Sequence, residues 1–385
     1  MRIGILTIHD SPNYGACLQC YALWKYLTNQ GYDCEVIDLH RPGAHEDYVP
    51  SKRFIKLRPS HPSFKFRIRG FVNKLLCKST TTTTKRKKVY SEQAKPKFDA
   101  FNSGIKLSSA YASIDEFYKN PPDYDVYIAG SDQLWNPTQP YCIEPYFLTF
   151  VRDKKKKKIS YSTSIGITDL TEKEKLLFKS WLKDFRSISV REAQAKTLLE
   201  SFCDYKIAQT IDPTFLLDVD DWKKLAVPNL MIKPYILYFA LHIDNDMLQY
   251  CIMLSKESKR PLYVLNQLQE DIKSNDYIQI IDAGPKEFLG YIQNAEMVIT
   301  DSFHGTVFSI ILGSNNFYSY IANPERGGRI VELLEMFDLS SHLLTSFDRS
   351  YSDLKGEHID RNKVMSIMNK KRALSSEFLK SSITS

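Results

Sequence analysis

The chain has 385 residues, 43% of them hydrophobic and 12% aromatic, which predicts two or three folded domains and excludes a wholly disordered protein. Its net charge of +7 is unevenly spread: residues 51–97 contain fifteen Lys and Arg residues and one acidic residue, so the remainder is mildly acidic and nucleic acid is not an expected partner. Seven irregularly spaced cysteines argue against a disulfide framework, and apolar runs such as Val307–Leu312 are far shorter than the roughly 18 residues of a membrane span, so we expect a globular cytoplasmic protein.

The first forty residues are typical of a strand, a helix and a second strand. An apolar run at Ile3–Ile8 precedes helically spaced apolar residues over Gly15–Asn29 and another apolar run at Cys34–Leu39. We expect the first run to be a strand and not a signal peptide, because it is short and has no small-residue cleavage site. A β-α-β unit of this kind predicts a parallel sheet. Further strands are predicted at Val126–Ala129, Ile159–Ser162, Ile188–Val190 and Ile207–Ile211, with helices at Glu172–Phe185 and Ala193–Phe202.

A second alternating series begins near Tyr235. Pro228, Asn229 and Pro234 mark a boundary, which divides the chain into domains at 1–228 and 229–385. Two successive α/β domains of similar size predict a ligand cleft between them. The second domain ends in one more helical pattern, over Asn362–Leu379. Its other predicted strands are Ile236–Ala240, Leu262–Leu265, Ile278–Ile281, Met297–Thr300 and Phe317–Tyr320, and its other helices are Met247–Lys256, Lys286–Asn294, Thr306–Leu312 and Ile330–Phe337.

The basic insert at 51–97 has two interpretations. Residues 64–76 mix cations with apolar side chains, and as a helix this segment would suit an anionic membrane surface. The alternative is a basic, partly disordered surface loop. A second run of cations, Lys154–Lys158, is interpreted as a solvated turn before its strand.

The sharpest local signal is the segment that follows the strand Met297–Thr300. Asp301 and Ser302 end the strand, and His304 and Gly305 stand where the chain turns into a helix. Amides at a helix N-terminus favour an anion, and a histidine there can exchange a proton near neutral pH. The alternative interpretation is a histidine that caps its own helix.

Cys17 and Cys20 form one Cys-x-x-Cys pair inside the first predicted helix. A redox or metal site would need a second pair or histidines at ligand spacing, and the sequence has neither. Helix packing is the favoured interpretation, and we predict no metal dependence.

Several motifs occur together and in a fixed order. They are Asn13-Tyr14-Gly15, Tyr127-Ile-Ala-Gly-Ser-Asp-Gln-Leu-Trp-Asn136, Ser189-Val-Arg-Glu192, Ile211-Asp-Pro-Thr-Phe215 and Thr300-Asp-Ser-Phe-His-Gly-Thr-Val. As an ordered set they resemble the polysaccharide pyruvyl transferase family, from about residue 2 to about residue 340 apart from the basic insert. The resemblance implies two Rossmann-like domains facing a cleft, similar to the GT-B glycosyltransferases.

The resemblance also implies a reaction. A pyruvyl group moves from phosphoenolpyruvate to two hydroxyls of a sugar, forming a cyclic ketal and releasing phosphate. The acceptor would belong to a surface polysaccharide, such as a capsule or exopolysaccharide, or to its lipid-linked precursor. That precursor would make docking at the inner face of the membrane through residues 64–90 useful. No cofactor is implied, since phosphoenolpyruvate is a substrate.

The motif positions suggest roles on the donor side, which the second domain is expected to supply. His304 matches the family's general acid, and Arg191 matches an arginine suited to the donor's carboxylate or phosphate. Ser302 and Gly305 belong to the same motif as His304 and are assigned to donor binding. Ser302 stands where many members carry an arginine, so we expect another cation to replace it, from a Gly-rich turn that opens the Ile330 helix. That turn contains Arg326 and Arg329.

This departure leaves a second interpretation open, in which the same fold serves a glycosyltransferase that uses a nucleotide sugar. On the acceptor side, expected in the first domain, Asn13 and Tyr14 form a loop after a strand, and Asp132 could act as base for an acceptor hydroxyl. Trp135 could stack on a sugar face, or it could pack in the core, as large aromatic residues usually do.

Overall fold

The computed structural model describes residues 1–41, 92–139, 141–228, 230–231, 234–241, 243–266, 274–314, 316–322 and 324–385. Residues 51–91 of the predicted basic insert, and with them the predicted membrane-docking segment 64–90, lie outside these ranges.

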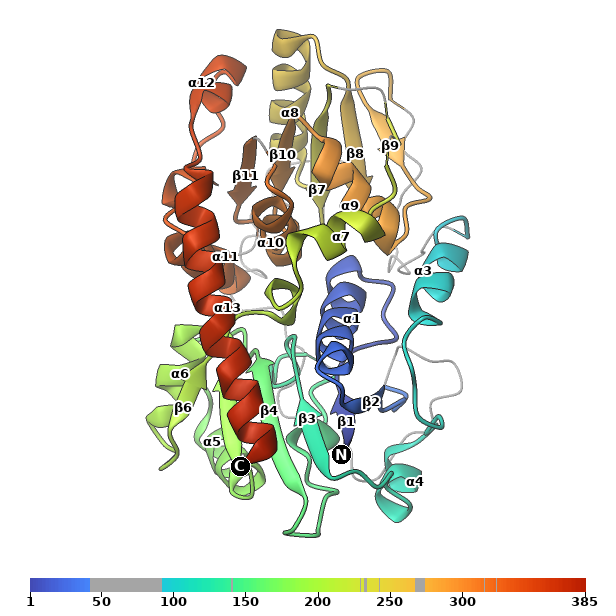
Figure 1. The fold of residues 1–385 in the computed structure, drawn as a ribbon. Helices are drawn as coiled ribbons and strands as arrows, with labels where there is room; N and C mark the ends of the chain where they lie inside the picture. The colour runs from blue at the N-terminus through green and yellow to red at the C-terminus, as the bar shows by residue number, and fades with distance from the viewer. Residues whose placement is uncertain are drawn as a thin grey trace, which may run out of the picture.

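The described chain forms two α/β domains, each built around one parallel sheet (Figure 1). The first sheet has the order β2-β1-β3-β4-β5-β6, and the second has the order β12-β11-β10-β7-β8-β9. The strands of the first sheet are β1 (Arg2–Leu6), β2 (Asp33–Val36), β3 (Val126–Ala129), β4 (Lys157–Thr163), β5 (Ser187–Val190) and β6 (Ile207–Gln209). Those of the second are β7 (Ile236–Ala240), β8 (Leu262–Asn266), β9 (Ile278–Ile280), β10 (Met297–Thr300), β11 (Asn316–Tyr320) and β12 (Leu343–Leu344).

Helices cover both sheets, as expected where every described strand pair is parallel. The α-helices are α1 (Tyr14–Asn29), α3 (Lys95–Asn102), α4 (Ile114–Lys119), α5 (Glu172–Leu182), α6 (Ala193–Glu200), α7 (Val219–Leu225), α8 (Asn245–Ser258), α9 (Pro285–Asn294), α10 (Phe303–Leu312), α11 (Pro324–Met336), α12 (Tyr351–Gly356) and α13 (Arg361–Thr384). Three short 3₁₀ helices lie at Glu144–Phe147, Pro213–Phe215 and Ser340–His342. The predicted two-domain α/β fold is confirmed.

Local chemistry explains where these helices begin. The Asn13 side chain caps α1 by accepting a hydrogen bond from the amide of Ala16, and Thr171 and Glu174 form a capping box at the start of α5. Pro324 occupies the first position of α11, where its fixed φ suits a helix. The Gly-rich turn predicted before Ile330 is therefore wrong, because the segment is already helical.

The two domains share a hydrophobic core. Tyr14, at the start of α1, stacks on Phe288 of α9 with ring centroids 4.6 Å apart, and its hydroxyl donates to the carbonyl of Ala283 at 3.0 Å. Cys17 and Leu18 of α1 belong to the same buried cluster, whose other members come mostly from the second domain. Helix α1 therefore joins the domains as well as covering the first sheet.

The last helix returns to the first domain. Helix α13, red in Figure 1, runs from beside the second domain down to the first sheet, where the chain ends. Arg372 donates hydrogen bonds to the carbonyls of Phe215 and Leu217, at 2.7 and 3.0 Å. Leu379 and Ile383 pack into a core of the first domain. The strands divide on either side of the predicted boundary after residue 228, but α13 packs on both domains.

The described cysteines are free thiols and are buried. Cys17 and Cys20 lie inside α1 and are fully buried, and burial raises the pKa of the Cys17 thiol to about 12. The packing interpretation of the Cys-x-x-Cys pair is therefore confirmed. Within the described ranges no group of three His, Cys, Asp or Glu side chains is arranged to hold a metal ion, and no helix is long and apolar enough to cross a membrane.

Candidate active site

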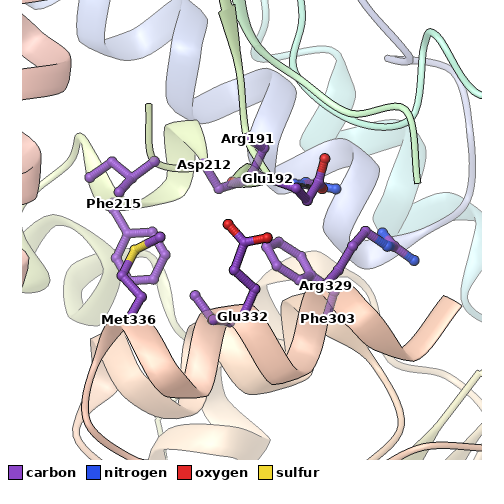
Figure 2. Close-up of a pocket in the computed structure, with 10 residues that line it drawn as sticks. Arg191, Glu192, Asp212, Phe215, Phe303, Arg329, Glu332 and Met336 are labelled. Carbon is purple, nitrogen blue, oxygen red and sulfur yellow. Dashed lines mark hydrogen bonds and ion pairs between the residues drawn. The ribbon is translucent and has the colours of Figure 1, made fainter. Parts of the chain in front are cut away.

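A pocket lies between the domains, where the residues that follow β5 and β6 face α11 and the start of α10 (Figure 2). Its volume is about 310 Å³, part of it open to solvent. Ligands bind at such strand ends in open parallel sheets. The lining residues are Arg191, Glu192, Ile211, Asp212, Phe215, Phe303, Arg329, Glu332, Leu333 and Met336. The pocket thus combines charged side chains from both domains with an apolar wall.

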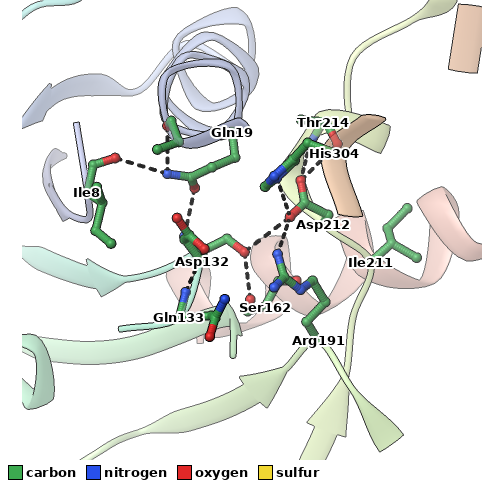
Figure 3. Close-up of polar contacts among 12 residues, drawn as sticks. Ile8, Gln19, Asp132, Gln133, Ser162, Arg191, Ile211, Asp212, Thr214 and His304 are labelled. Carbon is green, nitrogen blue, oxygen red and sulfur yellow. Dashed lines mark hydrogen bonds and ion pairs between the residues drawn. The ribbon is translucent and has the colours of Figure 1, made fainter. Parts of the chain in front are cut away.

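Asp212, directly after the loop that leaves β6, is the centre of a polar cluster (Figure 3). Its Oδ2 accepts a hydrogen bond from Nη1 of Arg191 at 2.8 Å and lies 3.5 Å from Nε2 of His304. The hydroxyl of Ser131 lies 3.5 Å from the same oxygen. Oδ1 accepts from the amide and the hydroxyl of Thr214, at 3.1 and 2.8 Å. One buried carboxylate therefore links an arginine of the first domain to a histidine of the second.

The charges around Asp212 decide its protonation state. Burial alone raises the pKa of this carboxyl, but the neighbouring His304 and Arg191 charges and the Thr214 amide outweigh burial and hold the pKa well below its usual range. Asp212 is therefore ionised at neutral pH, and it can hold the His304 ring in one orientation.

His304 lies in the first turn of α10, whose N-cap is Ser302. The histidine does not cap its own helix, because the Ser302 hydroxyl accepts the hydrogen bond from the Gly305 amide, at 3.2 Å. On its other side the imidazole meets Gly15 of α1: a Cβ built on this glycine would lie 2.0 Å from Nδ1 of His304. Helix α1 thus leaves room for the ring only because position 15 has no side chain.

Two arginines flank the ring of Phe303. The guanidinium carbon of Arg191 lies 4.1 Å from the ring centroid, and that of Arg329 lies 5.7 Å from it. Burial, together with the charge of the neighbouring Arg191, lowers the pKa of Arg329 to about 10. Two cations so close together in a buried site favour an anion between or beside them.

Some polar atoms in this pocket have no hydrogen-bond partner within the part of the chain that the structure describes. They are Nη2 of Arg191, Nε of Arg329 and Oε2 of Glu192. The Nε of Arg191 donates to Oε1 of Glu192 at 2.9 Å, so Arg191 keeps one free nitrogen after binding both carboxylates. Buried donors are rarely left unpaired, so the two guanidinium nitrogens are candidate contacts for a ligand.

A family model described as polysaccharide pyruvyl transferase matches residues 13–315. The chain belongs to the polysaccharide pyruvyl transferase family. The membership predicted from the ordered motifs is confirmed, and it makes the protein a transferase that acts on polysaccharide. A search of curated protein sequences found no match.

Several solved structures are similar to this chain. Arabidopsis thaliana UGT89C1 complexed with UDP-L-rhamnose is 11% identical with a TM-score of 0.54, over 100% of this chain and 98% of that one. The same protein complexed with quercetin is 9% identical with a TM-score of 0.51, over 98% and 99%. The UDP-GlcNAc 2-epimerase of Methanocaldococcus jannaschii is 14% identical with a TM-score of 0.49, over 97% and 94%. The two UGT89C1 structures, with TM-scores above 0.5, show a GT-B-like fold alone.

The other residues predicted to bind the donor are Ser302, Gly305, Arg326 and Arg329. Ser302 acts as a helix cap, and Gly305 lets α10 approach β10 closely, since a Cβ there would lie 2.5 Å from the Thr300 hydroxyl. Neither residue lines the pocket. Of the two predicted arginines of α11, Arg329 lines it, whereas the side chain of Arg326 lies outside the described part of the structure.

Three residues predicted for the acceptor side of the transferase have structural contacts instead. Asn13 caps α1, and Tyr14 is buried between the domains. Trp135 is completely buried, stacks on Phe147 at 5.2 Å and donates its indole N–H to the carbonyl of Tyr146. Its ring therefore has no exposed face for a sugar, and the core-packing alternative describes its position.

Asp132, the predicted base, lies beside the cluster at the end of β3 (Figure 3). It has a positive φ of 69° and is partly exposed, and its Oδ1 accepts from the amide of Gln133. With the Gln133 amide turned so that its oxygen faces Arg329, this oxygen lies 3.0 Å from both Nη atoms of the arginine. Gln133 thus connects Asp132, on the predicted acceptor side, to Arg329.

The sequence-based site omitted several residues of this pocket. Asp212 could have been predicted from the sequence, because it belongs to the Ile211-to-Phe215 motif just after a predicted strand. No sequence pattern identified Glu332 as a site residue, because it lies far from β5 in sequence. In the structure it accepts hydrogen bonds from the amide of Ala193 and from Gln209, the latter at 2.7 Å. Burial raises the pKa of Glu332. Only the tertiary fold brings α11 to this position.

Proposed function

We propose that this protein transfers a pyruvyl group from phosphoenolpyruvate to two hydroxyls of a sugar, forming a cyclic ketal and releasing phosphate. The sugar would belong to a surface polysaccharide or to its lipid-linked precursor. One observation carries the proposal: buried Asp212 joins Arg191 to His304 across the domain boundary, beside guanidinium nitrogens that have no described partner. The two arginines line one small pocket, and His304, which does not line it, lies 3.5 Å from Asp212, a carboxylate that does.

The donor's charges suit the two arginines. Phosphoenolpyruvate carries a carboxylate and a phosphate, and guanidinium groups bind both through paired hydrogen bonds. Arg191 and Arg329 would take these two groups, with Phe303 holding both guanidinium planes. Glu332 would oppose an anion if ionised, but the burial that raises its pKa favours its neutral form.

The chemical step requires a proton at the methylene carbon of the donor. His304 would supply this proton, and Asp212 would hold the ring in the productive orientation. Protonation leaves positive charge at the neighbouring carbon, which an acceptor hydroxyl attacks to form a C–O bond. The second hydroxyl then displaces phosphate from the same carbon, so the ketal has two new C–O bonds and one broken bond to the phosphate oxygen. Each hydroxyl loses one proton.

Asp132 is the proposed acceptor of a hydroxyl proton. It is partly exposed and lies near both arginines, so it can reach solvent and a bound sugar at once. The neutral imidazole left after the first step is a second acceptor on the same path. Asp132→Asn would slow ketal formation without preventing donor binding if the carboxylate has this role.

Donor identity is tested most directly by ligand-induced thermal stabilisation. Phosphoenolpyruvate at 100 times its dissociation constant should stabilise the folded protein by about 2.7 kcal/mol, which raises Tm measurably. The stabilisation should be lost in Arg191→Met and weakened in Arg329→Met. Arg186→Met, which removes an exposed guanidinium outside the pocket, is the matched control.

A small panel of nucleotide sugars is measured beside phosphoenolpyruvate. If UDP-glucose or another nucleotide sugar raised Tm and phosphoenolpyruvate did not, the pyruvyl donor would be wrong and the glycosyltransferase interpretation would replace it. Product analysis then follows with mass spectrometry, since a pyruvate ketal and a glycosyl residue add different masses.

A further inference from the structure

A large hollow lies at the opposite end of the first domain from the candidate active site. It surrounds the beginning of the green strand β4, near the bottom of Figure 1, and has a volume of about 1210 Å³, part of it open to solvent. Its cationic lining residues are Arg152, Lys154, Lys156, Lys158 and Lys183. Three lysines of the run predicted as a solvated turn, Lys154, Lys156 and Lys158, therefore line a concave surface.

Lys158 is the least expected member of this group. It is only 5% exposed, and among the residues that the structure describes its Nζ contacts one opposite charge, Asp184, at 3.8 Å. Burying an ammonium group costs free energy unless close hydrogen bonds compensate for it, and 3.8 Å is too long for one. The burial also lowers the pKa of Lys158. An anion entering the hollow would give this ammonium group a second opposite charge beside Asp184.

The rest of the lining fits a sugar. Trp181 is partly exposed and tilts against Phe147, with ring centroids 4.8 Å apart, and no described hydrogen bond uses its indole N–H. A partly exposed indole ring that lines a hollow can stack on a pyranose, and its N–H can bind a hydroxyl. Carboxylates in the lining can accept hydrogen bonds from further hydroxyls. They are Glu144, Asp153 and Asp184.

We propose that this hollow binds a carboxylate-bearing stretch of the polysaccharide on which the enzyme acts. The inference rests on the proposed function, because pyruvyl transfer adds one carboxylate to each modified sugar. A flat anionic membrane is a poorer fit, since the surface is concave. The seven-residue strand β4 spans roughly 20 Å from the hollow to Thr163, near the catalytic cluster, so one sugar cannot occupy both sites.

Binding is measured by calorimetric titration of the full chain with two probes, trigalacturonate as the acidic trisaccharide and maltotriose as the neutral one. We expect trigalacturonate to bind and maltotriose to bind at least tenfold more weakly. Lys158→Met keeps the length and packing of the buried side chain and should raise the Kd for trigalacturonate at least tenfold. Trp181→Leu keeps apolar bulk against Phe147 and should raise it similarly.

The matched control is Lys256→Met, which removes an exposed lysine from the second domain and should leave the Kd unchanged. Equal binding of the two trisaccharides, no binding of trigalacturonate, or an unchanged Kd in Lys158→Met would overturn the proposal. Sedimentation with phosphatidylcholine vesicles containing phosphatidylglycerol tests the lipid source of anions. Vesicle binding that is lost in Lys158→Met, without trigalacturonate binding, would assign the hollow to a membrane.

The design separates this proposal from the proposed function. Trigalacturonate binding should persist in His304→Ala, because the two sites lie at opposite ends of β4. If phosphoenolpyruvate fails to stabilise the protein but trigalacturonate binds, only the donor assignment is wrong. If phosphoenolpyruvate stabilises it and trigalacturonate does not bind, only the hollow is misassigned.

Discussion

At the scale of single residues, the proposed mechanism depends on His304 as a proton donor. His304→Ala should lower kcat by roughly 10²–10⁴-fold, because no general acid would then protonate the methylene carbon of the donor. The thermal stabilisation by phosphoenolpyruvate should remain, since the arginines are untouched. Steady-state kinetics and thermal shift measure the two effects, and His358→Ala, an exposed histidine of the same domain, is the control. Retained turnover would remove His304 from the mechanism.

Asp212 gives a prediction with a pH dependence. Its pKa is lower in the folded protein than the ordinary value near 3.9, so its stabilising contribution is complete above about pH 5 and is lost as pH falls toward the folded pKa. Asp212→Asn removes one of the two buried carboxylates that pair with Arg191, leaving Glu192, and should reduce the free energy of unfolding by about 3 kcal/mol at pH 7.

Urea unfolding of both proteins between pH 7 and pH 3.5 measures this contribution. The difference between wild type and variant should be constant above pH 5 and should narrow below about pH 4, as the unfolded carboxyl takes up its proton. A difference that stays constant down to pH 3.5 would mean that Asp212 is not held ionised by its neighbours.

Candidate site residues were predicted from their place at strand and helix ends, and the structure brings two of them together. Arg191 and His304 follow predicted strands and do lie in one cluster. Trp135 follows a strand too, but whether an aromatic face is open depends on what packs on it, here Phe147. The link through Asp212 joins segments from two domains, and spacing along the chain carries no information about such a contact.

At the scale of helices and strands, the packing of α1 against α10 positions His304, the proposed proton donor. Gly15→Ala adds a Cβ that would lie 2.0 Å from Nδ1 of His304, so the imidazole must move. We expect kcat to fall at least tenfold while stabilisation by phosphoenolpyruvate persists. Alanine is also a better helix former than glycine by about 1 kcal/mol, which offsets part of the cost of the clash.

Gly356→Ala is the matched control, because no atom lies within 4 Å of the Cβ it would add in α12. Crystal structures or histidine NMR signals of the Gly15 variant should show a displaced ring. Unchanged kcat in that variant would mean that the contact between α1 and α10 does not position His304.

Strands were predicted more closely than helices, for a physical reason. Parallel strands such as β3 and β7 are buried on both faces, so they are short continuous apolar runs that stand out in the sequence. Strand β12 has two residues and leaves no pattern. The start of α11 was placed too late, since Gly327 and Gly328 favour a turn while Pro324 and tertiary contacts favour a helix.

At the scale of the whole molecule, the two domains should unfold together. One hydrophobic cluster includes Tyr14 and Phe98 of the first domain and Phe288 and Phe308 of the second, and α13 packs on the first sheet. Differential scanning calorimetry should therefore give one transition, with equal calorimetric and van't Hoff enthalpies. A fragment of residues 1–228 should not fold alone, because it exposes this cluster and lacks α13. Two resolved transitions would contradict a shared core.

The alternation of strands and helices was sufficient to predict two α/β domains and a cleft. It was not sufficient to predict which domain α13 packs against, because a helix at the end of the chain has the same apolar spacing whichever domain it covers. Contacts such as Arg372 with the carbonyls of Phe215 and Leu217 decide its place, and they join residues more than 150 positions apart.

The buried thiols of α1 have a practical consequence. Cys17 lies in the core that the domains share, with no accessible surface and a pKa near 12, so an alkylating reagent reaches it only when α1 separates from the second domain. Its modification rate therefore measures how often the domains part, without any introduced label. A donor that closes the cleft should slow that rate, so the modification of this cysteine would report how often the domains open.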